Sequence, residues 1–333
     1  MIHNATPYMS SAVMLKKLVP GVTDYKKIVE DGICIDKTSY FAGIDRIKFS
    51  LLFRPSGFGK SLLLSTMRYY FDYKFEDQFE ELFKGTYVYD NPSPNKNSYS
   101  VMTIDFSGAK AKTEKQAEIE MNAIITKSIQ TFLDENGIED SGIDFSHQLT
   151  FIFDRLYERS ERPIFLLIDG YDRFFIDTDE SGCAIAPHFL ENFLADVQHE
   201  VQRGTIKRIV CAGAKPVAPT KPLIESNIAT SVDLYGDKLH DIAGMTPEDV
   251  QWLLGSIPNF NESEIELLYR TLKELYNGYS FRKSTSKTLF ETSSVLWYLH
   301  NYICARNRGF VTSDEMKARQ TRFEREMRYI FKI

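Results

Sequence analysis

The sequence predicts an α/β protein in which helices cover both faces of a mostly parallel β-sheet in three layers, followed by a smaller helical part. Short apolar runs alternate with longer segments that carry apolar residues at helical spacing. The strand-like runs stop at about residue 245, whereas helical patterns continue to about residue 300. We therefore expect one α/β unit with an appended helical one.

Four segments are predicted strands because they are short and mostly apolar, as strands covered on both faces should be. They are residues 49–53 (FSLLF), 101–106 (VMTIDF), 164–169 (IFLLID) and 206–212 (IKRIVCA). Helical patterns between and after them lie at about residues 60–73, 113–134, 146–160 and 187–203. This alternation predicts a parallel sheet, because each helix provides the crossover to the next strand.

The C-terminal third is predicted to be helical. Thr246 and Pro247 have the residue types of a helix cap and a first helical position. Residues 311–333 combine basic and apolar residues and are predicted to form an amphipathic helix that docks on the body. A partner-binding or nucleic-acid-binding arm is the alternative for this stretch.

Bulk composition favours a soluble globular protein. Of the 333 residues, 43% are hydrophobic and 26% are charged, and the net charge of -6 argues against a broad nucleic-acid-binding surface. The sequence has no apolar run of the roughly 18 residues that cross a bilayer. The cysteines are widely spaced, which predicts reduced thiols in a cytoplasmic protein. They are Cys34, Cys183, Cys211 and Cys304.

The segment RPSGFGKS at residues 54–61 ends like a phosphate-binding loop, G-x-x-x-x-G-K-[ST], and lies between a predicted strand and a predicted helix. Such a loop turns backbone N–H groups around the phosphates, while a lysine reaches the terminal phosphates and a hydroxyl binds Mg²⁺. The sequence therefore predicts a P-loop NTPase domain that binds a nucleoside triphosphate. The predicted nucleotide contacts are Arg54, Pro55, Ser56, Gly57, Phe58, Gly59, Lys60, Ser61 and Leu62.

The predicted strand at residues 164–169 ends in Asp169, which we expect to hold Mg²⁺ together with Ser61. Gly170 follows, where hydrolases of this lineage usually have the glutamate that orients water. A glycine cannot accept a proton. Either hydrolysis is slow or lost, or another carboxylate takes over. Asp172 is the nearest candidate for that catalytic role, and a cap at a helix start is the alternative for its side chain.

Five stretches, in this order, resemble the AAA-ATPase-like family of P-loop proteins, from about Val19 to Leu299. They are PGVTDYKKIVEDGICIDKTSYF, FRPSGFGKSLLLSTMRYYF, VMTIDFS, LLIDGYDR and YNGYSF. The resemblance implies ATP and Mg²⁺ as cofactors, and arginine is usual in the family at the position of Arg54. Family members are often fused to a PD-(D/E)xK nuclease-like domain, which we do not expect in the roughly 30 residues after Leu299.

Several positions depart from the family pattern. Gly170 replaces a glutamate, the region of Ala214 lacks a Ser or Thr, and Glu291 with Thr292 stands where Asn-Pro is expected. The resemblance then implies a divergent member.

Three motifs have two interpretations each. Residues 36–38 (Asp-Lys-Thr) either cap the first helix or contact the nucleotide region, and Asp105 is either a polar strand end or a water-positioning residue. Tyr279 and Phe281 are expected in the helical core, with a nucleotide contact as the alternative.

These patterns predict four regions: an N-terminal segment packed on the core (1–45), a P-loop NTPase domain (46–245), a helical lid (246–310) and the C-terminal helix (311–333). The predicted function is an Mg-ATP-dependent switch with weak or lost hydrolysis and an unknown protein partner; the sequence leaves the oligomeric state open. One alternative is a pseudo-ATPase interaction module, which would gain turnover if Gly170 became Glu. Another is a P-loop kinase for a small acceptor, which usually has an arginine-rich lid, whereas residues 246–300 offer only Arg270 and Arg282.

Overall fold

The computed structural model describes residues 18–111, 113–139, 149–160, 162–175, 187–215, 224, 229–232, 237–281 and 287–307. Every structural statement below concerns these residues. The predicted C-terminal helix, Arg282 and Cys183 lie outside them.

The centre of the fold is a five-stranded sheet in the order β2-β3-β4-β1-β5, and every pairing in it is parallel. The strands are β1 (Phe49–Phe53), β2 (Ser100–Asp105), β3 (Ile164–Asp169), β4 (Ile206–Gly213) and β5 (Thr230–Ser231). The four predicted strands are confirmed to within one residue at each end. The prediction missed β5, because two residues carry no periodicity.

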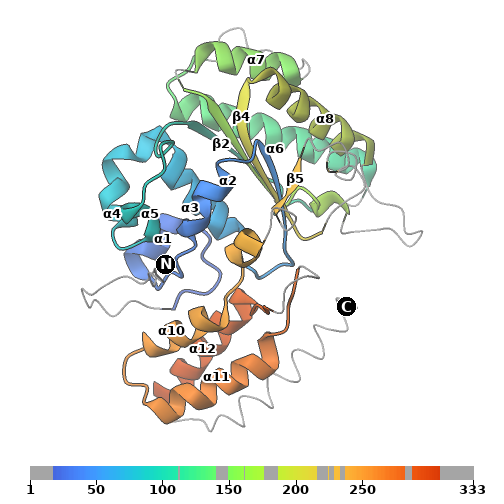
Figure 1. Ribbon diagram of the computed structural model, residues 1–333. Coiled ribbons are helices and arrows are strands. Elements are labelled where there is room, and N and C mark those ends of the chain that lie inside the picture. The colour runs from blue at the N-terminus through green and yellow to red at the C-terminus, as the bar shows by residue number, and fades with distance from the viewer. Residues whose placement is uncertain are drawn as a thin grey trace.

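Helices cover both faces of the sheet, which gives the predicted three layers (Figure 1). One face packs against α6 (Glu114–Glu135), α7 (Leu149–Arg159) and α8 (Pro187–Arg203). The other packs against α1 (Tyr25–Asp31), α2 (Phe41–Ile44), α3 (Lys60–Phe71), α4 (Phe79–Phe83) and α5 (Tyr87–Asp90). Side chains alternate between these two clusters along β3, as the period of two requires: Leu166 and Ile168 face the first, Phe165 and Leu167 the second.

Three further helices pack around an apolar cluster of their own, below the sheet in Figure 1. They are α10 (Pro247–Gly255), α11 (Glu262–Tyr276) and α12 (Thr292–Asn307). Thr246 caps α10 as predicted, and its side chain forms a capping box with Asp249. We call α10 to α12 the lid. Within the described part of the chain, no helix is both long and apolar enough to cross a membrane.

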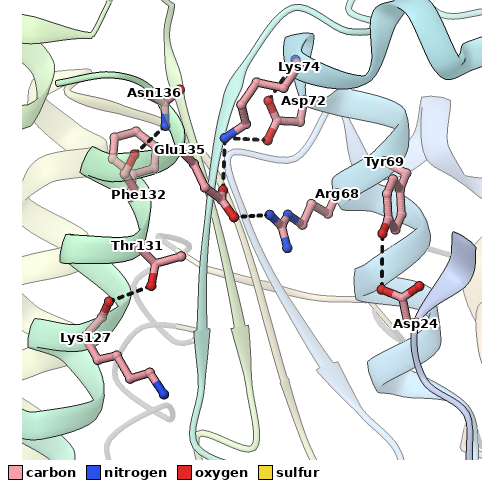
Figure 2. A network of polar contacts seen from close by, with 10 residues as sticks. All are labelled: Asp24, Arg68, Tyr69, Asp72, Lys74, Lys127, Thr131, Phe132, Glu135 and Asn136. Carbon is pink, nitrogen blue, oxygen red and sulfur yellow. Dashed lines mark hydrogen bonds and ion pairs between the residues drawn. The ribbon is translucent and has the colours of Figure 1, made fainter.

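An ionic network joins the end of α3 to the end of α6, as Figure 2 shows. Glu135 accepts hydrogen bonds from Arg68 at 2.6 Å and from Lys74 at 3.1 Å, and Lys74 also pairs with the buried Asp72. Partial burial raises the pKa of Glu135, but the two cations lower it further, so that its pKa lies below the ordinary value. Burial raises the pKa of Asp72, and Lys74 only partly opposes this.

We expect the Glu135 pairs to stabilise the fold at neutral pH and to fail in acid. A carboxyl group whose pKa is lowered by folding contributes stability above its unfolded pKa of about 4.3, and this is lost as pH falls through the folded pKa. Glu135→Gln should therefore reduce the free energy of unfolding by about 0.5–1 kcal/mol at pH 7 and by much less at pH 3.5. Urea unfolding of both proteins at each pH measures this.

The raised pKa of Asp72 acts in the opposite sense, but it is present in both proteins and cancels in the comparison. Glu81→Gln is a matched control, since Glu81 is exposed in the neighbouring helix α4. A difference between wild type and Glu135→Gln that is the same at both pH values would contradict the assignment.

Candidate nucleotide site

A cavity of about 330 Å³ lies at the carboxyl ends of the strands, where open α/β sheets bind ligands. Its floor is the loop before α3 together with the ends of β3 and β4. Its walls are the N-terminal segment around residues 19–38 and the lid, including Trp252 and Leu296. The floor of the cavity therefore carries polar groups, whereas the walls contribute several apolar side chains.

The phosphate-loop residues 56–62 line the floor of the cavity. Gly59 has φ +80°, a left-handed conformation that favours glycine, and α3 begins at the next residue. The free N–H groups and the dipole of α3 therefore favour an anion at this position. The Lys60 ammonium donates to the carbonyl oxygens of Arg54 at 2.7 Å and Pro55 at 2.9 Å. Burial lowers its pKa, and the nearby Asp169 and Asp172 oppose this shift.

The two predicted metal ligands meet: the Ser61 hydroxyl donates a hydrogen bond to the Asp169 carboxylate. Asp169 is buried, which raises its pKa; Ser61 lowers it and the Asp105 charge raises it. A buried carboxylate beside a hydroxyl and open to a cavity is a fitting donor set for Mg²⁺, which prefers hard oxygen ligands and takes most of the others from phosphates and water. Among the described residues, no group of three or more His, Cys, Asp or Glu could hold a metal by itself.

Arg54 and Pro55 are not among the residues that line the cavity. The Arg54 side chain is fully buried and its guanidinium donates to the carbonyl oxygens of Phe53 at 2.7 Å and His240 at 2.8 Å. It also lies 4.2 Å from the centre of the Phe281 ring. The Arg54 side chain therefore lies away from the cavity, which argues against the predicted contact with the nucleotide.

Gly170 turns the chain away after Asp169 and leaves no room for a side chain. Its φ is +65°, and a Cβ atom there would lie 2.8 Å from the backbone N and Cα of Ser107. Asp172 lines the cavity, but one of its oxygens accepts from the amides of Ala214 at 2.8 Å and Lys215 at 3.0 Å. These bonds hold the end of β4, and the catalytic role predicted for Asp172 stays a prediction.

The Asp-Lys-Thr motif at residues 36–38 lines the cavity and does not cap the first helix, which begins at Tyr25 with Asp24 as its cap. Asp36 accepts from the amides of Thr38 at 2.8 Å and Tyr87 at 2.7 Å. Lys37 pairs with Asp249 of α10 at 2.6 Å and so links the N-terminal segment to the lid. Sequence reasoning missed this link because Asp249 has no signal except its place in the capping box.

Asp105 lies opposite Asp169 in the β2–β3 register, is exposed, and accepts from the Ser107 amide at 2.8 Å. Asp105 does not line the cavity, which favours its interpretation as a polar strand end. Tyr279 and Phe281 were expected in the core of the helical part, and this prediction is wrong, because neither belongs to the lid cluster. Both rings instead contact Phe58 of the phosphate loop. They do not line the cavity either.

Strand β1, the phosphate loop and α3, with Ser61 bonded directly to Asp169 at the end of β3, form the arrangement of a P-loop α/β protein. The sequence profile of a family described as a predicted AAA-ATPase matches residues 20–221. The chain belongs to this AAA-ATPase-like family, which supports nucleotide binding in general. The comparison with curated proteins finds no match.

Several solved structures are similar at low sequence identity. A Walker-type ATPase of Pyrococcus abyssi is 12% identical over 96% of this chain and 80% of that chain, with a TM-score of 0.48. A chain of the Drosophila ORC bound to DNA is 11% identical, over 93% and 62% of the two chains, with a TM-score of 0.42. One from the E. coli MS115-1 HORMA:CdnC:Trip13 complex is 14% identical, over 73% and 66%, with a TM-score of 0.36. These scores add nothing to the geometry above.

The space around Gly170 yields a direct prediction. Gly137 has nearly the same φ, +63°, but a Cβ atom there would meet nothing within 4 Å. Gly137→Ala should therefore cost about 1 kcal/mol, the price of the left-handed conformation alone. Gly170→Ala should cost roughly 1–3 kcal/mol more, because the new methyl group would press on the Ser107 backbone. Denaturant unfolding of both variants measures the difference, and equal losses would contradict the contact.

Proposed function

We propose that the chain binds Mg-ATP in this cavity and acts as a nucleotide-dependent switch with slow or lost hydrolysis. The observation that carries the proposal is the contact between Ser61 at the start of α3 and Asp169 at the end of β3. A triphosphate on the loop amides would displace Lys60 from the loop carbonyls, and Mg²⁺ would take the two oxygens that are now bonded to each other. The apolar side chains of the cavity walls are suited to a nucleobase.

The proposal of slow hydrolysis rests on Gly170. A side chain at this position would meet the Ser107 backbone, so that the missing glutamate cannot simply be restored there. Gly170→Glu is therefore expected to destabilise the chain and not to create turnover, which corrects the expectation that this substitution would restore activity to a pseudo-ATPase. A pseudo-ATPase interaction module is the second candidate, and the same geometry favours it. Purified protein that binds Mg-ATP and forms no ADP would support it over a slow ATPase.

Two further expectations remain part of the proposal: a protein partner that responds to the nucleotide state, and a cytoplasmic location. The kinase alternative is supported by no contact among the described residues of the lid.

Nucleotide binding is tested first through Lys60. Removing one charge-assisted contact to phosphate costs roughly 1.5–3 kcal/mol, so Lys60→Ala should weaken Mg-ATP binding by roughly 10- to 150-fold. Isothermal titration calorimetry measures the affinity. Lys84→Ala is the control, because Lys84 is exposed and pairs only with the exposed Glu80 in the described structure. Equal affinities of wild type and Lys60→Ala would refute the site.

The metal is tested through Asp169. Asp169→Asn keeps the size of the side chain but removes the charge that would hold Mg²⁺, so the gain in ATP affinity on adding Mg²⁺ should largely disappear. Binding without Mg²⁺ should persist, because the loop amides and Lys60 are unchanged. Titrations of ATP with Mg²⁺ and with EDTA separate the two effects. An unaltered response of Asp169→Asn to Mg²⁺ would exclude this residue as the ligand.

A further inference from the structure

Four side chains join the phosphate loop to the lid. Phe58, at the centre of the loop, is 1% exposed. Its ring packs edge-to-face with the rings of Tyr279 and Phe281, with ring centres 5.0 Å and 5.2 Å apart. The guanidinium of Arg54 lies over the Phe281 ring, with its central carbon 4.2 Å from the ring centre. We call Arg54, Phe58, Tyr279 and Phe281 the clasp.

Main-chain hydrogen bonds add to the clasp. The Phe58 carbonyl accepts from the amide of Gly244, just before the lid, at 2.9 Å. The Gly57 carbonyl accepts from the amide of Ser293, in the first turn of α12, at 2.8 Å. The lid therefore holds the loop by its carbonyl groups, whereas a phosphate binds the amide groups of the same loop.

Peptide planarity links the two sets of groups. The Gly57 carbonyl and the Phe58 amide belong to one rigid plane, and so do the Phe58 carbonyl and the Gly59 amide. Turning either amide toward a phosphate therefore turns the opposite carbonyl, which is bonded to the lid. The loop and the lid side are also closely packed here. A Cβ atom on Gly57 would lie 2.3 Å from a Glu291 carboxylate oxygen, and one on Gly244 would lie 2.9 Å from the Phe58 ring.

We infer that the clasp residues are positioning residues that couple the amide cradle of the phosphate loop to the lid, so that nucleotide binding and lid position change together. This inference rests on the proposed nucleotide site. It identifies the connection between that site and the lid as the side of the phosphate loop that faces away from the phosphates, where the Phe58 ring and the carbonyls of Gly57 and Phe58 lie. Coupling of this kind is reciprocal, so breaking it changes nucleotide affinity as well as the lid.

The test compares the response of the lid to nucleotide in clasp variants. Hydrogen–deuterium exchange is followed in the loop and in α10 to α12, with and without saturating Mg-ATP. In wild type, nucleotide should change exchange in both regions. In Phe281→Ala, the loop should still respond while the lid loses most of its response, and Mg-ATP affinity should change roughly fivefold or more. Phe281→Tyr keeps the ring and should restore the lid response.

Two controls separate coupling from a merely structural role. Leu267→Ala removes an exposed lid side chain outside the clasp and should leave the lid response intact. Ser293→Pro removes the amide hydrogen that bonds Gly57 and puts a ring carbon in its place, at a first-turn position where proline is tolerated, whereas Ser293→Ala removes only the hydroxyl and keeps that amide. Ser293→Pro should therefore lose the lid response and Ser293→Ala should keep it. This pair also carries the test if Phe281→Ala fails to fold.

The outcomes are distinct. Nucleotide that binds wild type and protects the loop without changing the lid overturns the clasp proposal but leaves the nucleotide site standing. A lid response in Phe281→Ala and Ser293→Pro equal to that of wild type also overturns the clasp proposal. Absence of binding to wild type refutes the nucleotide site, and with it the coupling.

Discussion

The hydrogen bond between Ser61 and Asp169 joins the two parts of the sequence on which the site depends. Ser61 lies in the first turn of α3, and Asp169 ends β3, which is separated from β1 by β4 in the sheet. The contact exists only because the parallel strands end at one edge and α3 packs across the sheet near that edge. Burial of Asp169 makes its charge costly without a partner, so the geometry favours a cation at this point.

Close backbone packing around this contact limits what chemistry the site can support. Gly170 and Gly213 flank the strand ends, and a Cβ atom on Gly213 would lie 2.3 Å from the Tyr171 ring. Asp172, the nearest other carboxylate in the sequence, is bonded to the amides at the end of β4. The same packing that positions Asp169 therefore leaves no place after it for the usual water-orienting side chain. These constraints support the proposal of slow or lost hydrolysis.

The sequence predicted the parts of this structure that are encoded locally. The runs FSLLF and IFLLID are apolar over their full length, and both are strands with the predicted bounds. The G-K-S triplet predicted the turn into α3 because its residue types match a backbone requirement. β5 escaped because a two-residue strand has no pattern and depends on its neighbour β1.

Contacts between distant segments were outside the reach of sequence patterns. An arginine in a phosphate loop suggests a nucleotide contact, yet Arg54 points to His240 and Phe281, which are more than 180 residues away in the chain. Tyr279 and Phe281 looked like core residues because they are aromatic, and nothing near them in the sequence identifies Phe58 as their partner. The Lys37–Asp249 pair has the same origin: two ordinary surface-type residues meet only because the lid folds over the N-terminal segment.

A crystal structure of the chain with Mg²⁺ and a non-hydrolysable ATP analogue would test the proposed site most directly. We expect the Ser61–Asp169 hydrogen bond to be broken and Mg²⁺ to lie between these residues, with the Ser61 oxygen about 2.0–2.1 Å from the metal. We also expect the phosphates to bind the amides of residues 57–61 and the Lys60 ammonium to turn toward them. A nucleotide bound elsewhere, with Ser61 and Asp169 still joined, would contradict the proposed site.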